Sequence, residues 1–184
     1  MNGELGKGIP ETAKNQSSID RVNNLSDSVE ERQAIFDEGL NAAKAQDLSV
    51  DETNITAKLD EIRLGKQSGN GEYEYRSFTS KSDAVKFLKA NSDWFAADGV
   101  YHGSGEISIY ATATSSGTLL SSPPGSLLSS RFKFGLSFNR RLTGVENVLQ
   151  TISHETGHFK GLSHSDLSLY DREYLAVKKY RSRQ

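Results

Sequence analysis

The segment HETGHFKGLSH, residues 154–164, constrains this chain most, because it holds three of the four histidines in the sequence. Its first part, HETGHFKG, is the end of the stretch TGVENVLQTISHETGHFKG, residues 143–161. The apolar residues of this stretch recur at helical spacing and predict one amphipathic helix, with Phe159 among the buried residues. Thr143 and Glu146 form a capping box at the start, and Gly161 provides a C-terminal stop. The histidines are therefore expected at and just beyond the end of a partly buried helix.

The spacing of these histidines predicts a metal site. His154 and His158 are four residues apart, so on a helix their rings project from one face and can bind one ion. Gly161 can adopt a positive φ that turns the chain back and brings His164 to the same ion. Three imidazoles and a water form the open tetrahedral arrangement of catalytic zinc. Glu155 can reach that water without binding Zn2+, so we predict that Glu155 is the general base. The predicted reaction is hydrolysis of a peptide bond.

The full pattern HExxHxxGxxH, present here as HETGHFKGLSHS, resembles the metzincin clan of zinc metallopeptidases, and especially its matrixin branch. The resemblance implies His154, His158 and His164 as zinc ligands and Glu155 as general base. It also implies an α+β, zincin-like fold: a twisted mixed sheet with a backing helix, the active-site helix and a small C-terminal subdomain. An antiparallel edge strand, expected within residues 107–130, would hold the substrate as an added strand. The same resemblance favours an extracellular or delivered enzyme.

The chain departs from that family downstream of His164. Metzincins place a methionine in a tight turn beneath the metal, whereas the only methionine here is Met1. We expect Leu167 or Leu169 to supply the apolar floor instead. Glu173 is an alternative to His164 as the third ligand, although its spacing from the HExxH motif is short.

We expect two parts in the chain. Residues 1–65 are predicted to form an N-terminal extension, flexible at first and then helical, and residues 66–184 a catalytic domain. Capping boxes predict helices over residues 28–46 and 49–65 of the extension. The turn cluster KQSGNG, residues 66–71, marks the boundary. The catalytic domain is predicted to contain strands over residues 72–80, 105–113 and 131–140, helices over 82–95 and 168–184, and a surface loop over 115–130.

Two roles remain open for the extension. As a pro-segment it would lie over the cleft, and because the chain has no cysteine, an acidic side chain such as Asp20, Asp27 or Asp37 would have to occupy the metal. As a linker from a larger parent protein it would leave the site untouched.

Composition narrows the partners. No apolar run is long enough to cross a bilayer, the first residues lack the apolar core of a signal peptide, and the basic residues form no aromatic-interleaved patch. We therefore expect no membrane and no nucleic-acid partner, and a monomer acting on a protein or peptide substrate. The alternative is a non-catalytic or toxin-type module that keeps the motif for zinc binding and folding.

Overall fold

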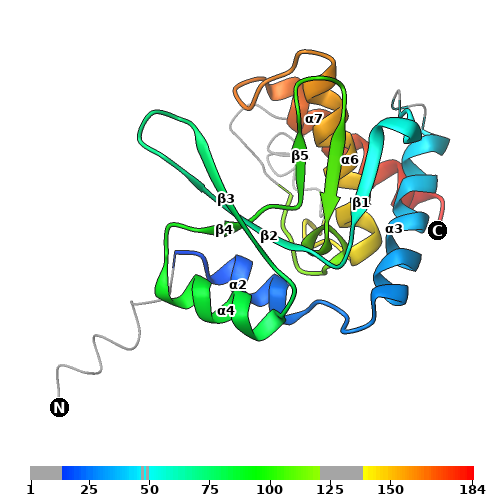
Figure 1. Cartoon of the computed structure of the whole chain (residues 1–184). Coiled ribbons are helices and arrows are strands. Elements are labelled where there is room, and N and C mark those ends of the chain that lie inside the picture. Colours follow the sequence, from blue (N-terminus) through cyan, green and yellow to red (C-terminus); the bar gives the residue numbers. More distant parts are fainter. Residues whose placement is uncertain (1–13, 47, 49, 121–138) are drawn as a thin grey trace.

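The computed structural model describes residues 14–46, 48, 50–120 and 139–184, and these residues form an α+β structure (Figure 1). The strand predicted over residues 131–140 lies almost entirely outside the described residues. In chain order the elements are α2 (Gln16–Asn23), α3 (Val29–Ala45), η1 (Glu52–Asn54), β1 (Ile55–Lys58), β2 (Ile62–Gln67), β3 (Tyr73–Phe78), α4 (Lys81–Ala90), β4 (Phe95–Ala96), β5 (Gly99–Tyr101), β6 (Ile107–Tyr110), η2 (Ala111–Thr114), α6 (Gly144–Phe159) and α7 (Leu167–Ser182).

The described strands form two three-stranded sheets. In the first sheet β6 lies in the centre, parallel to β1 and antiparallel to β5. In the second sheet β2 lies between β3 and β4 and is antiparallel to both. The hairpin of β2 and β3 projects from the body of the molecule (Figure 1), and the KQSGNG cluster forms its turn. This cluster is therefore a hairpin turn, with Gly71 at a φ of 86°.

The helices predicted from capping boxes at Ser28 and Thr143 are confirmed as α3 and α6, and the helix predicted over residues 82–95 is present as α4 but ends at Ala90, so that Phe95 belongs to β4. The side chains of Ser28, Ser80 and Thr143 each accept a hydrogen bond from a backbone N–H in the first turn of these helices. These contacts satisfy donors that a helix leaves unpaired at its start. The predicted C-terminal helix is also confirmed, as α7.

The helix predicted over residues 49–65 is wrong. Asp51 caps only the single turn η1, and the chain then forms β1 and β2. The apolar residues Ile55, Leu59 and Ile62 do have helical spacing, but β-branched Ile55 and its neighbours pair with β6 along the sheet. Tertiary pairing outweighs a weak helical preference over so short a segment.

The predicted boundary after residue 65 lies inside β2. One hydrophobic cluster joins both sides of it, because Phe36 and Ala43 of α3 and Leu59 are buried together with Val148 and Leu149 of α6. A second cluster packs α2 and α4 against the other sheet, with Ile19, Val22, Ile62, Leu64, Leu88 and Trp94 in its interior. Residues before and after the boundary thus share both cores.

An edge strand was expected within residues 107–130, of which residues 121–130 lie outside the described residues; within residues 107–120 the strand is β6, which is not an edge. β6 is the central strand, paired on both sides and buried at all four positions. The antiparallel edge of that sheet is β5, which precedes β6 in the chain. The alternation of apolar and polar residues over residues 105–113 predicts a strand with one exposed face, but β6 is covered on both faces, so its residues do not alternate between buried and exposed.

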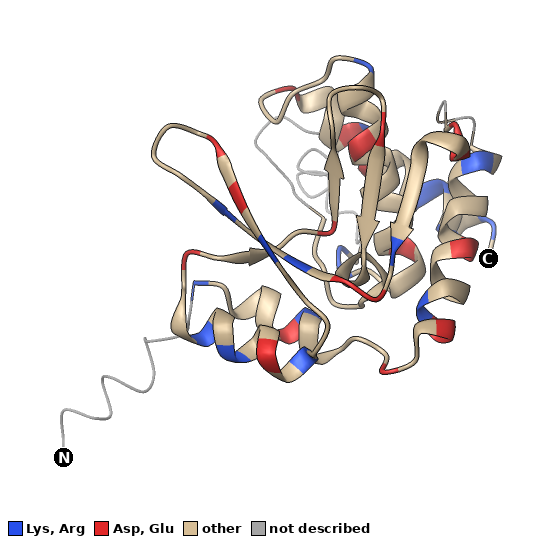
Figure 2. Ribbon diagram, in the orientation of Figure 1, with Lys and Arg blue, Asp and Glu red and all other residues tan. Residues whose placement is uncertain are grey.

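Lys or Arg and Asp or Glu are interspersed along α3 and over the pair α2 and α4 (Figure 2). None of the described helices has the length and apolar character of a membrane span.

Candidate metal centre

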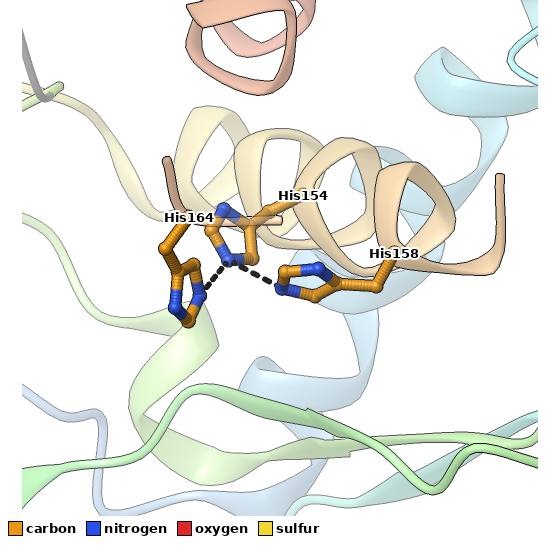
Figure 3. A group of neighbouring side chains, drawn as sticks. All are labelled: His154, His158 and His164. Carbon is orange, nitrogen blue, oxygen red and sulfur yellow. Dashed lines mark hydrogen bonds between the residues drawn. The ribbon is translucent and has the colours of Figure 1, made fainter. Parts of the chain in front are cut away.

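Helix α6 carries the first two histidines. Its N-terminus has the reciprocal capping box: Thr143 Oγ1 accepts from the Glu146 N–H at 3.2 Å, and a Glu146 carboxylate oxygen accepts from the Thr143 N–H at 3.0 Å. Toward the other end of the helix, His154 and His158 project from one face (Figure 3). Their ring centroids are 4.6 Å apart. The predicted helix and the pairing of these rings are confirmed.

The loop after α6 returns the third histidine to the same place. Gly161 has a φ of 89°, which only glycine adopts without strain, and the Leu162 N–H donates to the Gly157 carbonyl at 3.0 Å. The chain then reverses, and Tyr170 Oη donates to the His164 carbonyl at 2.8 Å. His164 thereby faces His154, as its position in the motif suggested.

The Nε2 atoms of the three rings converge. His154 Nε2 lies 3.1 Å from His158 Nε2 and 3.1 Å from His164 Nε2 (Figure 3). One ligand atom from each ring can be chosen so that all lie within 4.8 Å of one another. Nitrogens that bind one tetrahedral zinc at about 2.0–2.1 Å are about 3.3 Å apart. The spacing therefore suits a single small cation.

The other nitrogens of two rings show which atoms are free to bind that cation. His158 Nδ1 lies 2.8 Å from the Leu162 carbonyl oxygen, and His154 Nδ1 lies 3.2 Å from Glu173 Oε2. Both oxygens are acceptors, so each Nδ1 carries the proton and each Nε2 has a lone pair. Two lone pairs then face each other at 3.1 Å. A shared proton or a cation removes this repulsion, and the donor set fits zinc.

Glu173 has a role that the sequence did not reveal. The sequence offered it as an alternative zinc ligand, but it lies behind His154, is only 3% exposed and also accepts a hydrogen bond from Gln150 Nε2. Burial would lower the pKa of His154, but the hydrogen bond and negative charge of Glu173 outweigh it and raise that pKa. One signal was present: Leu169, Glu173 and Val177 lie four residues apart, so Glu173 is a charge on the buried stripe of α7.

Glu155, the predicted general base, lies beside the histidines and is 6% exposed. Burial raises the pKa of its carboxyl to about 7, with His154 opposing the rise and Glu173 and Asp98 adding to it. Gly99 of β5 allows a close approach here, because a Cβ at that position would lie 3.2 Å from Glu155 Cγ. The carboxyl therefore lies between α6 and the edge strand.

The histidines and Glu155 open into a cleft of about 540 Å³ between α6, β5 and the second sheet. It is lined by Gly65, Gln67, Tyr73, Tyr75, Phe95, Ala96, Ala97, Asp98, Gly99, Val100, Tyr101, Gln150, Thr151, His154, Glu155, His158 and His164. The predicted ligands and base thus share one concave surface with residues from before and after the expected boundary.

Strand β5 lines this cleft and, among the described strands, pairs only with β6. Asp98 O accepts from the Tyr110 N–H at 2.9 Å, and the His102 N–H donates to Glu106 O at 2.9 Å. Hydrogen-bonded residues alternate along an antiparallel strand, so the N–H and C=O of Gly99 and Tyr101 point away from β6. This edge can accept an added strand.

Of the two leucines expected to form an apolar floor, Leu169 of α7 packs against α6. Leu169 is fully buried, and a Cβ on Gly157 of α6 would lie 2.4 Å from Leu169 Cδ1. Leu167, the other candidate, is 42% exposed. Phe159 was predicted to be buried but is 56% exposed, because the helix ends there and its ring turns toward Tyr101. His102 is exposed, as expected of a surface histidine.

No acidic residue of the expected extension reaches the cleft in the part of the chain that the structure describes. Asp20, Asp27 and Asp37 are all absent from its lining. The extension contributes Gly65 to the lining, and Arg21 of α2 binds Asp98 at 2.6 Å. Its described residues support one wall of the cleft and do not cover the histidines.

Comparisons with protein-family models, with curated proteins and with solved structures found no match to this chain. The functional assignment therefore rests on the geometry of the chain itself.

Proposed function

We propose that this chain is a zinc-dependent endopeptidase of the metzincin type. The observation that carries the proposal is the convergence of three histidine Nε2 atoms beside a buried glutamate in an open cleft. In His154 and His158 the other ring nitrogen, Nδ1, faces an acceptor oxygen outside the cluster. Three imidazoles with room for a fourth partner are characteristic of catalytic zinc rather than structural zinc.

When bound, zinc supplies a Lewis acid that polarises a peptide carbonyl and lowers the pKa of a water molecule. The chain's residues do the rest. His154, His158 and His164 would hold the ion, and Glu155 would take the proton of the attacking water and return it to the departing amine.

The edge of β5 would hold the substrate backbone. Gly99 and Tyr101 offer N–H and C=O groups along the cleft, and a peptide that pairs with them would pass close to Glu155 and the histidines. We thus assign to β5 the substrate-binding role that the sequence led us to expect of a strand within residues 107–130.

Features of the fold also support the metzincin type. The first sheet is mixed, α3 packs behind it, α6 carries the motif, and only α7 follows His164. Leu169 would take the place of the missing methionine as the floor beneath the ligands.

The test is cleavage of casein and of a broad peptide library by purified, zinc-loaded protein. We expect cleavage that a chelator stops and added zinc restores. The matched variant Glu155→Gln should keep equimolar zinc but lose activity by about 10²–10⁴-fold, the usual contribution of general acid–base catalysis. A wild type no faster than Glu155→Gln, at full zinc content, would instead favour the non-catalytic zinc-binding module.

A further inference from the structure

One face of the second sheet carries exposed aromatic side chains. Tyr73, Tyr75 and Phe95 keep 51%, 36% and 47% of their surface exposed. Gly65, in the central strand, is paired with both Tyr75 and Phe95, so these positions share one face. Tyr73 lies two residues from Tyr75 and belongs to the same face. We call the surface of these four residues the aromatic wall.

The aromatic wall faces the metal centre. All four of its residues line the cleft that also contains the three histidines and Glu155. On the opposite face of the same sheet, Ile62 and Leu64 of β2 pack on α2 and α4, whereas Glu74 and Arg76 of β3 are exposed. The sheet therefore supports the wall from behind and leaves its aromatic side open to whatever enters the cleft.

The two tyrosine rings of the wall make contacts that orient them. Tyr73 and Tyr75 are stacked with centroids 6.0 Å apart, and the Arg63 guanidinium lies 4.9 Å from the centroid of Tyr75. Arg63 is fixed in turn by Ser77 Oγ at 2.9 Å and by Glu61 at 3.2 Å. Burial raises the pKa of Tyr75, so its phenol stays neutral. Rings with little freedom lose little entropy on binding, which suits a recognition surface.

The charges of the cleft limit what the wall can accept. The described lining contains the carboxyl groups of Asp98 and Glu155 and no Lys or Arg. No Lys or Arg of the described lining could pair with an acidic side chain, whereas an apolar side chain would cover aromatic surface that water now contacts.

We propose that the aromatic wall binds an apolar side chain, aromatic or long aliphatic, of the peptide substrate, near the bond that is cut. This inference rests on the proposed peptidase function for the identity of the occupant. A peptide paired with Gly99 and Tyr101 would lie between α6 and the wall, so a side chain pointing away from α6 meets the rings. The surface is concave and shared with the metal centre, which suits a single extended segment better than a second folded copy.

Direct binding tests the inference without catalysis. The probes are fluorescein-labelled decapeptides that differ only at one central position, which is Phe, Leu, Ala or Asp. The protein is the Glu155→Gln variant, measured with and without zinc by fluorescence anisotropy. We expect the Phe and Leu peptides to bind about 10-fold more tightly than the Ala peptide, and the Asp peptide to bind most weakly.

The variants Tyr75→Ser and Phe95→Ser, each made in that background, should reduce the preference for Phe over Ala to less than about 3-fold. The matched control is Leu175→Ser, because Leu175 is 49% exposed on α7 and lies outside the cleft lining. It should keep the full preference. Circular dichroism and zinc affinity report whether each variant folds, and Phe95→Ser carries the test if Tyr75→Ser does not.

The outcomes separate the two proposals. If the wild type cuts peptides but neither the affinity nor the cleavage rate depends on the varied side chain, the wall inference is overturned and the peptidase proposal stands. If the Phe preference and its loss in the variants are observed while the wild type cuts nothing, the wall binds apolar side chains and the peptidase proposal fails. If Tyr75→Ser converts a dimer into a monomer in gel filtration, the wall covers a second copy and the inference is overturned.

Discussion

The carboxylate of Glu173 lies 3.2 Å from Nδ1 of His154, while Nε2 of the same ring faces the other two histidines. This imidazole connects the C-terminal helix to the candidate metal centre. Partners of this kind fix the orientation of a ligand and make it a better donor. Helix α7 is therefore part of the candidate site, although it carries none of the three histidines.

Replacing Glu173 should weaken zinc binding. Glu173→Ala leaves the His154 Nδ1–H without its acceptor, and we expect about a 10–100-fold loss of zinc affinity. Glu173→Gln should lose less, because its amide oxygen can still accept. Competition with a chromophoric chelator gives the affinities directly. The exposed Glu106→Gln removes the same charge and should change nothing; losses under about 3-fold for both Glu173 variants would show that the contact is incidental.

Gly39→Ala should destabilise the protein although alanine favours helices. A Cβ at this position of α3 would lie 2.5 Å from Val148 Cβ of α6. Overpacking costs about 1–3 kcal/mol, which exceeds the gain of up to about 1 kcal/mol in helix propensity. Urea unfolding should therefore show a lower free energy of unfolding.

The control for that variant is Gly69→Ala in the hairpin turn, where a Cβ meets nothing within 4 Å. We expect it to change the free energy of unfolding by less than about 0.5 kcal/mol. A Gly39→Ala protein more stable than the wild type would mean that α3 does not pack on α6.

Arg181→Met should lower stability in a pH-dependent way. Arg181 binds Glu146 at 2.7 Å, and Glu146 is 5% exposed at the start of α6. Burial alone would raise the pKa of Glu146, but the hydrogen bonds from Arg181 and Thr143 outweigh it and lower that pKa. The stabilisation is thus present above the unfolded pKa of a glutamate, about 4.3, and is lost as the pH falls through the lower folded value.

We expect Arg181→Met to cost roughly 1–3 kcal/mol at pH 7 and much less at pH 3, measured by urea unfolding at both values. A cost that stayed equal at the two pH values would assign the effect to contacts that do not titrate, such as the hydrogen bonds of Arg181 to the carbonyls of Asn139 and Arg141, and not to the ion pair.

Local sequence determined the parts of the site that depend on one helix and one turn. The capping box at Thr143, the four-residue spacing of His154 and His158, and the positive φ of Gly161 each act within a few residues. Their positions therefore follow from the amino-acid sequence alone. The same holds for α3 and α4, where a serine cap begins each helix.

The remaining features depend on contacts between distant segments. Residues 55–67 have helical spacing, and only pairing with β6, β3 and β4 makes them strands. Gly and Asn are common both in turns within a domain and in linkers between domains, so the KQSGNG cluster suggests a domain boundary although it forms a hairpin turn. Glu173 joins His154 across 19 residues, and β5 becomes the edge strand through its partner β6. The stripe Leu169, Glu173 and Val177 indicates that Glu173 is buried, but no local pattern in the sequence identifies His154 as its partner or β5 as the edge strand.

The most direct test of the metal centre is X-ray absorption at the zinc edge on protein loaded with one equivalent of zinc. We expect three imidazole nitrogens and about one oxygen, each at about 2.0–2.1 Å from the zinc. The variant His164→Ala should show two imidazoles. A wild-type spectrum with two imidazoles or fewer, or one unchanged by His164→Ala, would contradict the claim that these three rings hold a single ion.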